Sequence, residues 1–448
     1  MESRIILYSH TMVATELDGF FHISERGSTI RRELVAGLVT FVSIVYIIII
    51  NPGILRAAGI PYEACVAATI VTAAFGCFVM GAYANRPFAV ATYMGENAFV
   101  AYTVVGVLHY SWQAALGAVF VSGILLVILT LSGWRSVMSD AVPASLKISF
   151  SVGIGLFLTF VGLIDSGIVV VGSGSVPVEI GNLHTAAVLL AIVGFVLTAI
   201  LLVKKVPGAI FFGIVATAAL AFILGAAPLP DGVASLPPDI TPTFFQMDLA
   251  GVLTLGMFPV VLTLFTMMFL DTMGTLIGMG ARAGFLDKNG NIPEVEKPFL
   301  ADALATTAGG ILGTTTNGVF VESAAGIEQG GRTGLVAIVV GGLMLLALFF
   351  APLFSAIPAL ATGPVLILVG LMMLQPVTRL DFQDYAELIP AFTVIAMMSF
   401  TYNIGVGMCA GFVLWPIFAI VKGKFREIPP PCWALFVLCL LFFIFYPY

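Results

Sequence analysis

Charged residues are scarce in this sequence. Asp, Glu, Lys and Arg make up 9% of the 448 residues, whereas hydrophobic residues make up 60%. A soluble domain carries about 25% charged residues. The composition therefore excludes an ordinary soluble domain and predicts a chain that crosses a membrane many times. The formal net charge of −6 says little about partners, because the placement of charges matters more than their sum in such a protein.

Cysteine, histidine and enzyme motifs are equally sparse. The four histidines lie near or beyond the ends of the apolar segments, and no metal cluster, nucleotide-binding loop or Ser-His-Asp set is visible. We therefore expect no enzyme, no cofactor, no metal site and no binding of nucleic acid. The cysteines lie inside apolar segments, without metal-ligand spacing or exposed pairs, at Cys65, Cys77, Cys409, Cys432 and Cys439.

Apolar segments follow one another along the chain, and we predict about fourteen membrane spans. The first seven cover about residues 35–52, 63–83, 88–107, 112–133 and 147–165, a segment ending at Lys204-Lys205 and another ending near Pro228. The second seven cover about residues 250–280, 299–313, a glycine-rich stretch around Glu322, and 334–352, 359–376, 387–401 and 403–421. A last apolar run, 431–447, is long enough for a short span or an interfacial helix, and both interpretations stay open.

The basic residues predict the orientation. When the spans alternate across the membrane, every Lys and Arg other than Arg56 falls on one side. The positive-inside rule then places the N-terminus in the cytoplasm, and no removable signal peptide is visible.

Seven spans followed by seven make the second half enter the membrane from the opposite side, which is the inverted repeat of many secondary transporters. We expect five parts: a cytoplasmic segment (1–33), a first repeat (34–228), an external linker (229–249), a second repeat (250–421), and a basic segment with a short apolar helix (422–448).

The third span of each repeat is interrupted. Thr92–Asn97 breaks the first, and the stretch from Thr314 to Glu322 breaks the second, with an extended run expected over Val319–Val321. Non-helical backbone at membrane depth is tolerated only where it is buried in protein or lines a cavity. Paired broken segments in corresponding positions predict a binding site at the midplane.

The residues at these breaks suit a planar ligand with both donors and acceptors. Ionised Glu322 accepts from ligand N–H groups, Asn97 donates and accepts, and free N–H groups at half-helix N-termini bind electronegative atoms. Asp271, a second intramembrane acid, is a candidate proton carrier with Glu322. The predicted substrate-binding residues are Tyr93, Gly95, Asn97, Phe99, Phe320, Val321 and Glu322.

Structural interpretations compete with these roles. Glu322 could cap a half-helix, Asp271 could be a partner of nearby threonines, and Asn97 could be a helix cap. Glu96 and Glu328 are expected to face water or a helix end.

Several motifs resemble the AzgA-like purine permeases, a branch of the nucleobase–cation symporters related to xanthine and uracil permeases. The resemblance covers residues 28 to 445, and Val321-Glu322-Ser323-Ala324-Ala325-Gly326 is its most specific part. Met94-Gly95-Glu96-Asn97-Ala98-Phe99 and Leu270-Asp271-Thr272-Met273-Gly274-Thr275-Leu276 resemble the third-span and eighth-span motifs. The resemblance implies an all-α fold of fourteen spans, with a core domain (spans 1–4 and 8–11) and a gate domain (spans 5–7 and 12–14).

The same resemblance implies proton-coupled uptake of adenine, guanine or hypoxanthine across the plasma membrane. The sequence departs from the family pattern at Ala91-Thr92-Tyr93, at Met268 and at Thr316-Asn317-Gly318-Val319, so the preferred purine stays open. An anion such as sulfate, another nucleobase such as xanthine or uracil, and a channel are the alternatives. The oligomeric state is also open, with a homodimer as one option.

Overall fold

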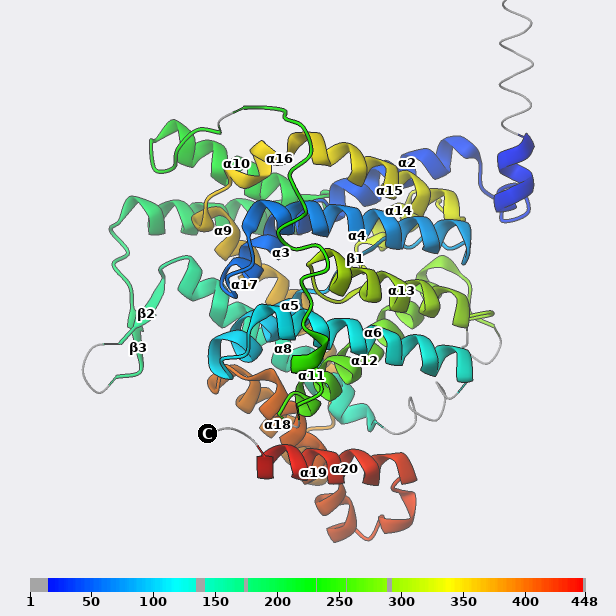
Figure 1. The fold of residues 1–448 in the computed structure, drawn as a ribbon, viewed down its shortest axis with the longest axis vertical. Coiled ribbons are helices and arrows are strands. Elements are labelled where there is room, and N and C mark those ends of the chain that lie inside the picture. Colours follow the sequence, from blue (N-terminus) through cyan, green and yellow to red (C-terminus); the bar gives the residue numbers. More distant parts are fainter. Residues whose placement is uncertain are drawn as a thin grey trace, which may run out of the picture.

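The computed structural model describes residues 15–133, 142–172, 176–230, 232–254, 256–287 and 292–445, which form a bundle of helices (Figure 1). Among these residues, 9 helical stretches are long and apolar enough to cross a membrane. Shorter apolar helices accompany them at Ala209–Ile223, Tyr385–Phe400 and Pro430–Ile444. The chain is therefore the all-α, multi-pass membrane protein that the composition predicts.

The first half of the chain contains α2 (Ile30–Ile44), α3 (Ile47–Arg56), α4 (Tyr62–Ala82), β1 (Val90–Thr92), α5 (Met94–Ala98), a π-helical stretch (Phe99–Val107), α6 (Trp112–Ser132), α8 (Ala144–Asp165), β2 (Val169–Val171), β3 (Val178–Ile180), α9 (Ala186–Val203) and α10 (Ala209–Ile223). The second half contains α11 (Leu249–Val252), α12 (Phe258–Ala283), α13 (Glu296–Leu312), β4 (Asn317–Val319), α14 (Ser323–Glu328), α15 (Gly334–Ala347), α16 (Ala351–Ser355), α17 (Ala359–Met373), α18 (Tyr385–Phe400), α19 (Ile404–Val421) and α20 (Pro430–Phe445). Short 3₁₀ turns lie at Leu348–Phe350, Gln375–Arg379 and Phe425–Glu427. Each of the fourteen predicted spans has a counterpart among these elements.

The helices pack as two groups. In the first group, α4 packs against α3, α13 and α15, α6 packs against α12 and α13, and α2 packs against α14 and α15. In the second, α17 packs against α8, α9 and α10, and α18 packs against α8 and α19. We call these the core group and the gate group, since they correspond to spans 1–4 with 8–11 and to spans 5–7 with 12–14.

Glycines allow the close approach of α8 and α17 in the gate group. A Cβ atom at Gly155 would lie 2.7 Å from the carbonyl oxygen of Gly370, and one at Gly162 would lie 2.6 Å from that of Gly363. Small residues of this kind let transmembrane helices pack backbone against backbone.

The two interrupted spans meet at the centre of the core group. β1 and β4 form a two-stranded antiparallel sheet that pairs Val90 with Val319, Ala91 with Gly318 and Thr92 with Asn317. All six residues are buried, and the sheet packs against α4 through β1 and against α13 through β4 (Figure 1). Further backbone bonds continue the pairing at both ends, from Tyr93 to Thr316 at 3.0 Å and from Phe320 to Ala89 at 2.9 Å. The non-helical backbone is thus paired internally, as membrane depth requires.

Two local expectations are wrong. The extended run in the tenth span is Asn317–Val319 and not Val319–Val321, because the register with β1 fixes it earlier. The first span does not end at Asn51-Pro52-Gly53 but continues to Arg56 with Pro52 inside α3. The Asn51 side chain holds this stretch by donating to the hydroxyls of Thr69 and Thr314 at 2.7 and 2.8 Å.

Between the fifth and sixth spans, the described residues form the antiparallel strands β2 and β3, which pair Val169 with Ile180 and Val171 with Val178. At the other end of the chain, α20 packs against α19 and is 16 residues long.

Candidate functional site

Tyr93 joins the third-span break to the eighth and tenth spans. It lies between β1 and α5, and its ring covers Gly318 so closely that a Cβ atom there would lie 2.2 Å from ring atoms. Its hydroxyl lies 3.3 Å from the Thr275 hydroxyl on α12. The side chain is 8% exposed. Only glycine at position 318 leaves room for this tyrosine.

Asn97 lies inside α5 and is completely buried, so the interpretation as a helix cap is wrong. Its Oδ1 accepts a hydrogen bond from the Thr315 hydroxyl, which comes from the loop before β4. Its Nδ2 has no partner among the described residues. A buried amide with a free donor normally has an unseen partner, such as water or a ligand.

Glu96 contradicts the prediction that it faces water or a helix end, because it is completely buried. Its carboxyl group lies against that of Asp271, which α12 carries in a half-buried position. Neither oxygen of Glu96 has a hydrogen-bond partner among the described residues. Asp271 therefore lies against a second acid as well as beside its threonine neighbours.

Asp302 on α13 is a buried acid that our sequence reasoning missed. It is completely buried, and its Oδ2 accepts from the N–H of Val319 at 3.2 Å, so it holds β4 in place. Its Oδ1 has no partner within the described residues. Asp302 and Asp271 both lie near the Tyr93 phenol. A lone acid in the apolar run 299–313 was the signal in the sequence, since such acids are rare and functional in membrane spans.

Glu322 lies at the head of α14, directly after Val321, and is half-buried. Its side chain makes no capping hydrogen bond to α14, so the structural interpretation as a cap is wrong. Its Oε1 instead accepts from the hydroxyl of Tyr46 at 2.7 Å. Tyr46 stands between α2 and α3 in the first span, and nothing in the sequence marked it.

The remaining predicted residues are apolar or small, and most of them pack against neighbouring helices. Gly95 packs against Ile154 of α8, where a Cβ atom would lie 2.9 Å from Cγ2. Phe99 is 2% exposed and lies against Gly405 of α19, so both residues are at the boundary with the gate group. Phe320 is 5% exposed, whereas Val321 is 45% exposed.

The structure thus brings the predicted residues together in two places. Tyr93, Asp271 and the two further acids form one cluster, and Glu322 with Tyr46 forms another. No hydrogen bond or ion pair among the described residues joins Glu322 to Asp271. The half-helix α14 has only 6 residues, so its dipole contributes less than we expected, whereas α5 continues directly into the π-helical stretch Phe99–Val107.

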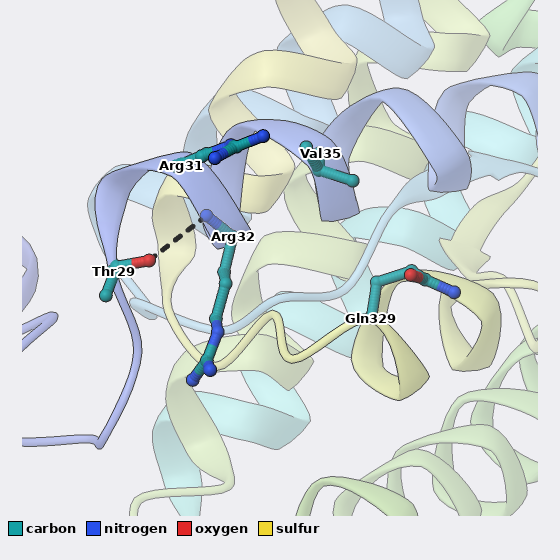
Figure 2. Close-up of a pocket in the computed structure, with 5 residues that line it drawn as sticks. All are labelled: Thr29, Arg31, Arg32, Val35 and Gln329. Carbon is teal, nitrogen blue, oxygen red and sulfur yellow. Dashed lines mark hydrogen bonds between the residues drawn. The ribbon is translucent and has the colours of Figure 1, made fainter.

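The described ranges contain no group of three His, Cys, Asp or Glu placed to hold a metal ion. A cavity of about 420 Å³ lies away from the paired strands, at the start of α2 and the end of α14. Figure 2 shows its lining, with Thr29, Arg31, Arg32 and Val35 on one segment and Gln329 on the other. None of the predicted site residues lines it.

Comparison with known proteins gives a consistent picture. A family model for xanthine/uracil permeases, described as "Permease family", matches residues 31–414. The guanine/hypoxanthine permease PbuG of Bacillus subtilis is 40% identical over 95% of this chain and 99% of its own length. The adenine permease AdeQ of Escherichia coli is 38% identical over 92% of each chain.

Among solved structures, the transmembrane domain of the cyanobacterial bicarbonate transporter BicA superposes with a TM-score of 0.60. The match covers 85% of this chain and 96% of that domain at 15% identity. At this identity the likeness concerns the fold alone, and it agrees with the inverted repeat of seven and seven spans.

Proposed function

This chain belongs to the AzgA-like branch of the xanthine/uracil permease family, and from this premise we propose that it imports purine nucleobases. Relatives that cover nearly the whole chain are named guanine/hypoxanthine and adenine permeases. The observation that carries the proposal is Glu322, a half-buried carboxylate at membrane depth that caps no helix. Such a group is costly in a membrane unless a ligand or a proton uses it.

The recognition chemistry follows from the donors and acceptors at the two breaks. Purine bases present ring N–H groups and ring nitrogen or carbonyl acceptors along one edge. Ionised Glu322 accepts from N–H groups, while the free Nδ2 of Asn97 donates to an acceptor. Tyr93, Phe99 and Phe320 supply apolar surface for the ring. Hypoxanthine, guanine and adenine all fit this description.

Proton coupling is assigned to the Glu96–Asp271 pair together with Glu322. Two carboxyl groups in contact hold one proton between them more readily than none, because like charges repel. Release and rebinding of that proton, as the core group moves against the gate group, would couple transport to the proton gradient. This extends the expectation for Asp271 by adding Glu96 as its partner.

The cellular setting completes the proposal. The one-sided distribution of Lys and Arg supports a cytoplasmic N-terminus, and uptake of nucleobases requires the plasma membrane. The partners are a purine, protons and the bilayer, with a homodimer compatible with this arrangement.

The test is uptake of labelled hypoxanthine in cells that lack their own purine uptake. Unlabelled adenine, guanine, xanthine, uracil and sulfate serve as competitors, with and without a protonophore. Saturable uptake that purines compete and the protonophore abolishes is expected. Competition by sulfate but not by purines would contradict the proposal and favour an anion carrier, although a carboxylate at the site disfavours an anion. Ion currents without saturation would instead indicate a channel.

A further inference from the structure

Tyr46 is the one side chain in the described residues that bonds Glu322, and it comes from a distant part of the sequence. The hydroxyl donates to Oε1 at 2.7 Å across a separation of 276 residues. Tyr46 is 0% exposed, so its hydroxyl has no access to bulk water. A buried hydroxyl without a partner is unfavourable, and here the partner is the carboxylate itself.

The backbone places Tyr46 at an irregular turn of the first span. α2 ends at Ile44 and α3 begins at Ile47, with the N–H of Ile49 bonded to the Tyr46 carbonyl three residues before it. A 3₁₀-like turn of this kind changes the direction in which side chains leave a helix.

Close packing fixes the distance between the two side chains. A Cβ atom at Gly326 of α14 would lie 2.1 Å from Oγ1 of Thr40 and 2.6 Å from the carbonyl oxygen of Ala36, both on α2. The backbone of α14 therefore rests directly on α2, and Glu322 and Tyr46 are held by the same contact. Glycine at 326 is the residue that permits it.

The carboxylate is fixed on one side and open on the other. Oε1 is occupied by the tyrosine, Glu322 is half-buried, and the preceding Val321 is 45% exposed. A carboxylate has lone pairs on both oxygens, so its second oxygen can accept from a ligand N–H while the first stays bonded.

We propose that Tyr46 is a positioning residue that orients Glu322 for the N–H groups of a purine base. The inference rests on the proposed function. Tyr46 touches Glu322 and not the substrate, and it acts by keeping one rotamer of the carboxylate in place. Preorganised acceptors bind more tightly because less freedom is lost on binding.

The test compares Tyr46→Phe with the wild type and with the control Tyr62→Phe. The control removes the hydroxyl of a tyrosine at the start of α4, outside the site. Hypoxanthine uptake gives the apparent KM and the maximal rate, and the purified proteins give the melting temperature with and without hypoxanthine. For Tyr46→Phe we expect a KM raised about tenfold, as for loss of one hydrogen bond to a charged group. We expect a maximal rate within about twofold and an unchanged melting temperature without ligand.

Each possible outcome either supports or overturns the positioning role of Tyr46. If uptake becomes too weak for a KM, loss of the hypoxanthine-induced rise in melting temperature supports the proposal when the unliganded protein is unaffected. An unchanged KM overturns it. A lowered melting temperature without ligand, or a lower maximal rate at constant KM, also overturns it, because either would give Tyr46 a structural or translocation role. Absence of purine uptake by the wild type would instead defeat the proposed function.

Discussion

The two interrupted spans share a sheet but differ in how they meet their surroundings. In the third span, Glu96 and Asn97 follow β1 and are completely buried, enclosed by α12 and the loop before β4. In the tenth span, Val321 and Glu322 follow β4. Val321 is exposed and Glu322 is half-buried. The polar residues of the third-span break are therefore enclosed by protein, whereas the residues of the tenth-span break are partly exposed.

The difference separates two tasks that the sequence motifs do not distinguish. Glu96 at the third-span break lies against the half-buried Asp271 of α12, which suits the storage of a proton, while its neighbour Asn97 keeps a free amide donor for the base. The half-buried acid at the tenth-span break has one protein donor and an open side, which suits binding of a ligand. An inverted repeat thus places similar backbone at both breaks while the side chains diverge.

The largest expected effect comes from Glu322. Replacing it with Gln or Ala should abolish uptake or lower it by at least about 100-fold, because charged hydrogen bonds to the base are lost. The amount of protein in the membrane should stay the same. Uptake of labelled hypoxanthine and immunoblotting of membranes measure both quantities. Normal uptake by Glu322→Ala would contradict the assignment of Glu322 to purine binding.

The acid pair tests the other side of the comparison. Asp271→Asn should make the remaining uptake insensitive to a protonophore and lower its initial rate about 10- to 100-fold, as for loss of a charged hydrogen bond. Glu96→Gln should act in the same direction, since its amide can donate to Asp271 and removes the shared proton. Hypoxanthine binding to both variants should persist. If both variants still accumulate purine against a gradient, the pair has no coupling role.

Glycine substitutions compare the packing of the two breaks. Gly318→Ala places a Cβ atom 2.2 Å from the Tyr93 ring and should destabilise the protein by about 1–3 kcal/mol through overpacking. Gly95→Ala meets Ile154 Cγ2 at 2.9 Å and should have a smaller effect, since that side chain can shift by a few tenths of an ångström. Thermal unfolding in detergent measures both.

The matched control is Gly342→Ala on α15, where nothing lies within 4 Å of the added atom. Helix propensity predicts a gain of about 0.5–1 kcal/mol there. Equal destabilisation by all three substitutions would show that the two breaks do not differ in packing.

The smallest effect is expected at the end of the tenth-span half-helix. Glu328 is 68% exposed and forms an ion pair with Arg282 at 3.3 Å, as the prediction that it faces water or a helix end requires. Exposed pairs contribute little to stability, so Glu328→Gln should change uptake by less than about twofold. A loss as large as that of Glu322→Gln would mean that negative charge anywhere in this segment matters.

The sequence predicts the architecture well because its signals are local. Long apolar runs, uneven basic residues and the glycine-interrupted segments predict the spans, the inverted repeat and the two breaks. The pairing of β1 with β4 confirms that both spans are interrupted where the sequence predicts, near Thr92–Asn97 and within Thr314–Glu322. The contact of the Tyr93 ring with Gly318 joins the two halves of the chain, and no local signal predicts it.

Long-range contacts could not be predicted in the same way. Tyr46 lies in a run of isoleucines and meets Glu322 only because two spans pack together. The burial of Glu96 depends on α12, and the strand contact of Asp302 depends on the register of β4. A rule that an intramembrane acid is functional identifies Asp302 but says nothing about its partner.

Titration calorimetry of the purified protein with hypoxanthine tests the central claim most directly, namely that the tenth-span break is the open, ligand-binding one. The account predicts saturable binding by the wild type and by Glu328→Gln, and none by Glu322→Gln. Binding by Glu322→Gln with the affinity of the wild type would contradict it.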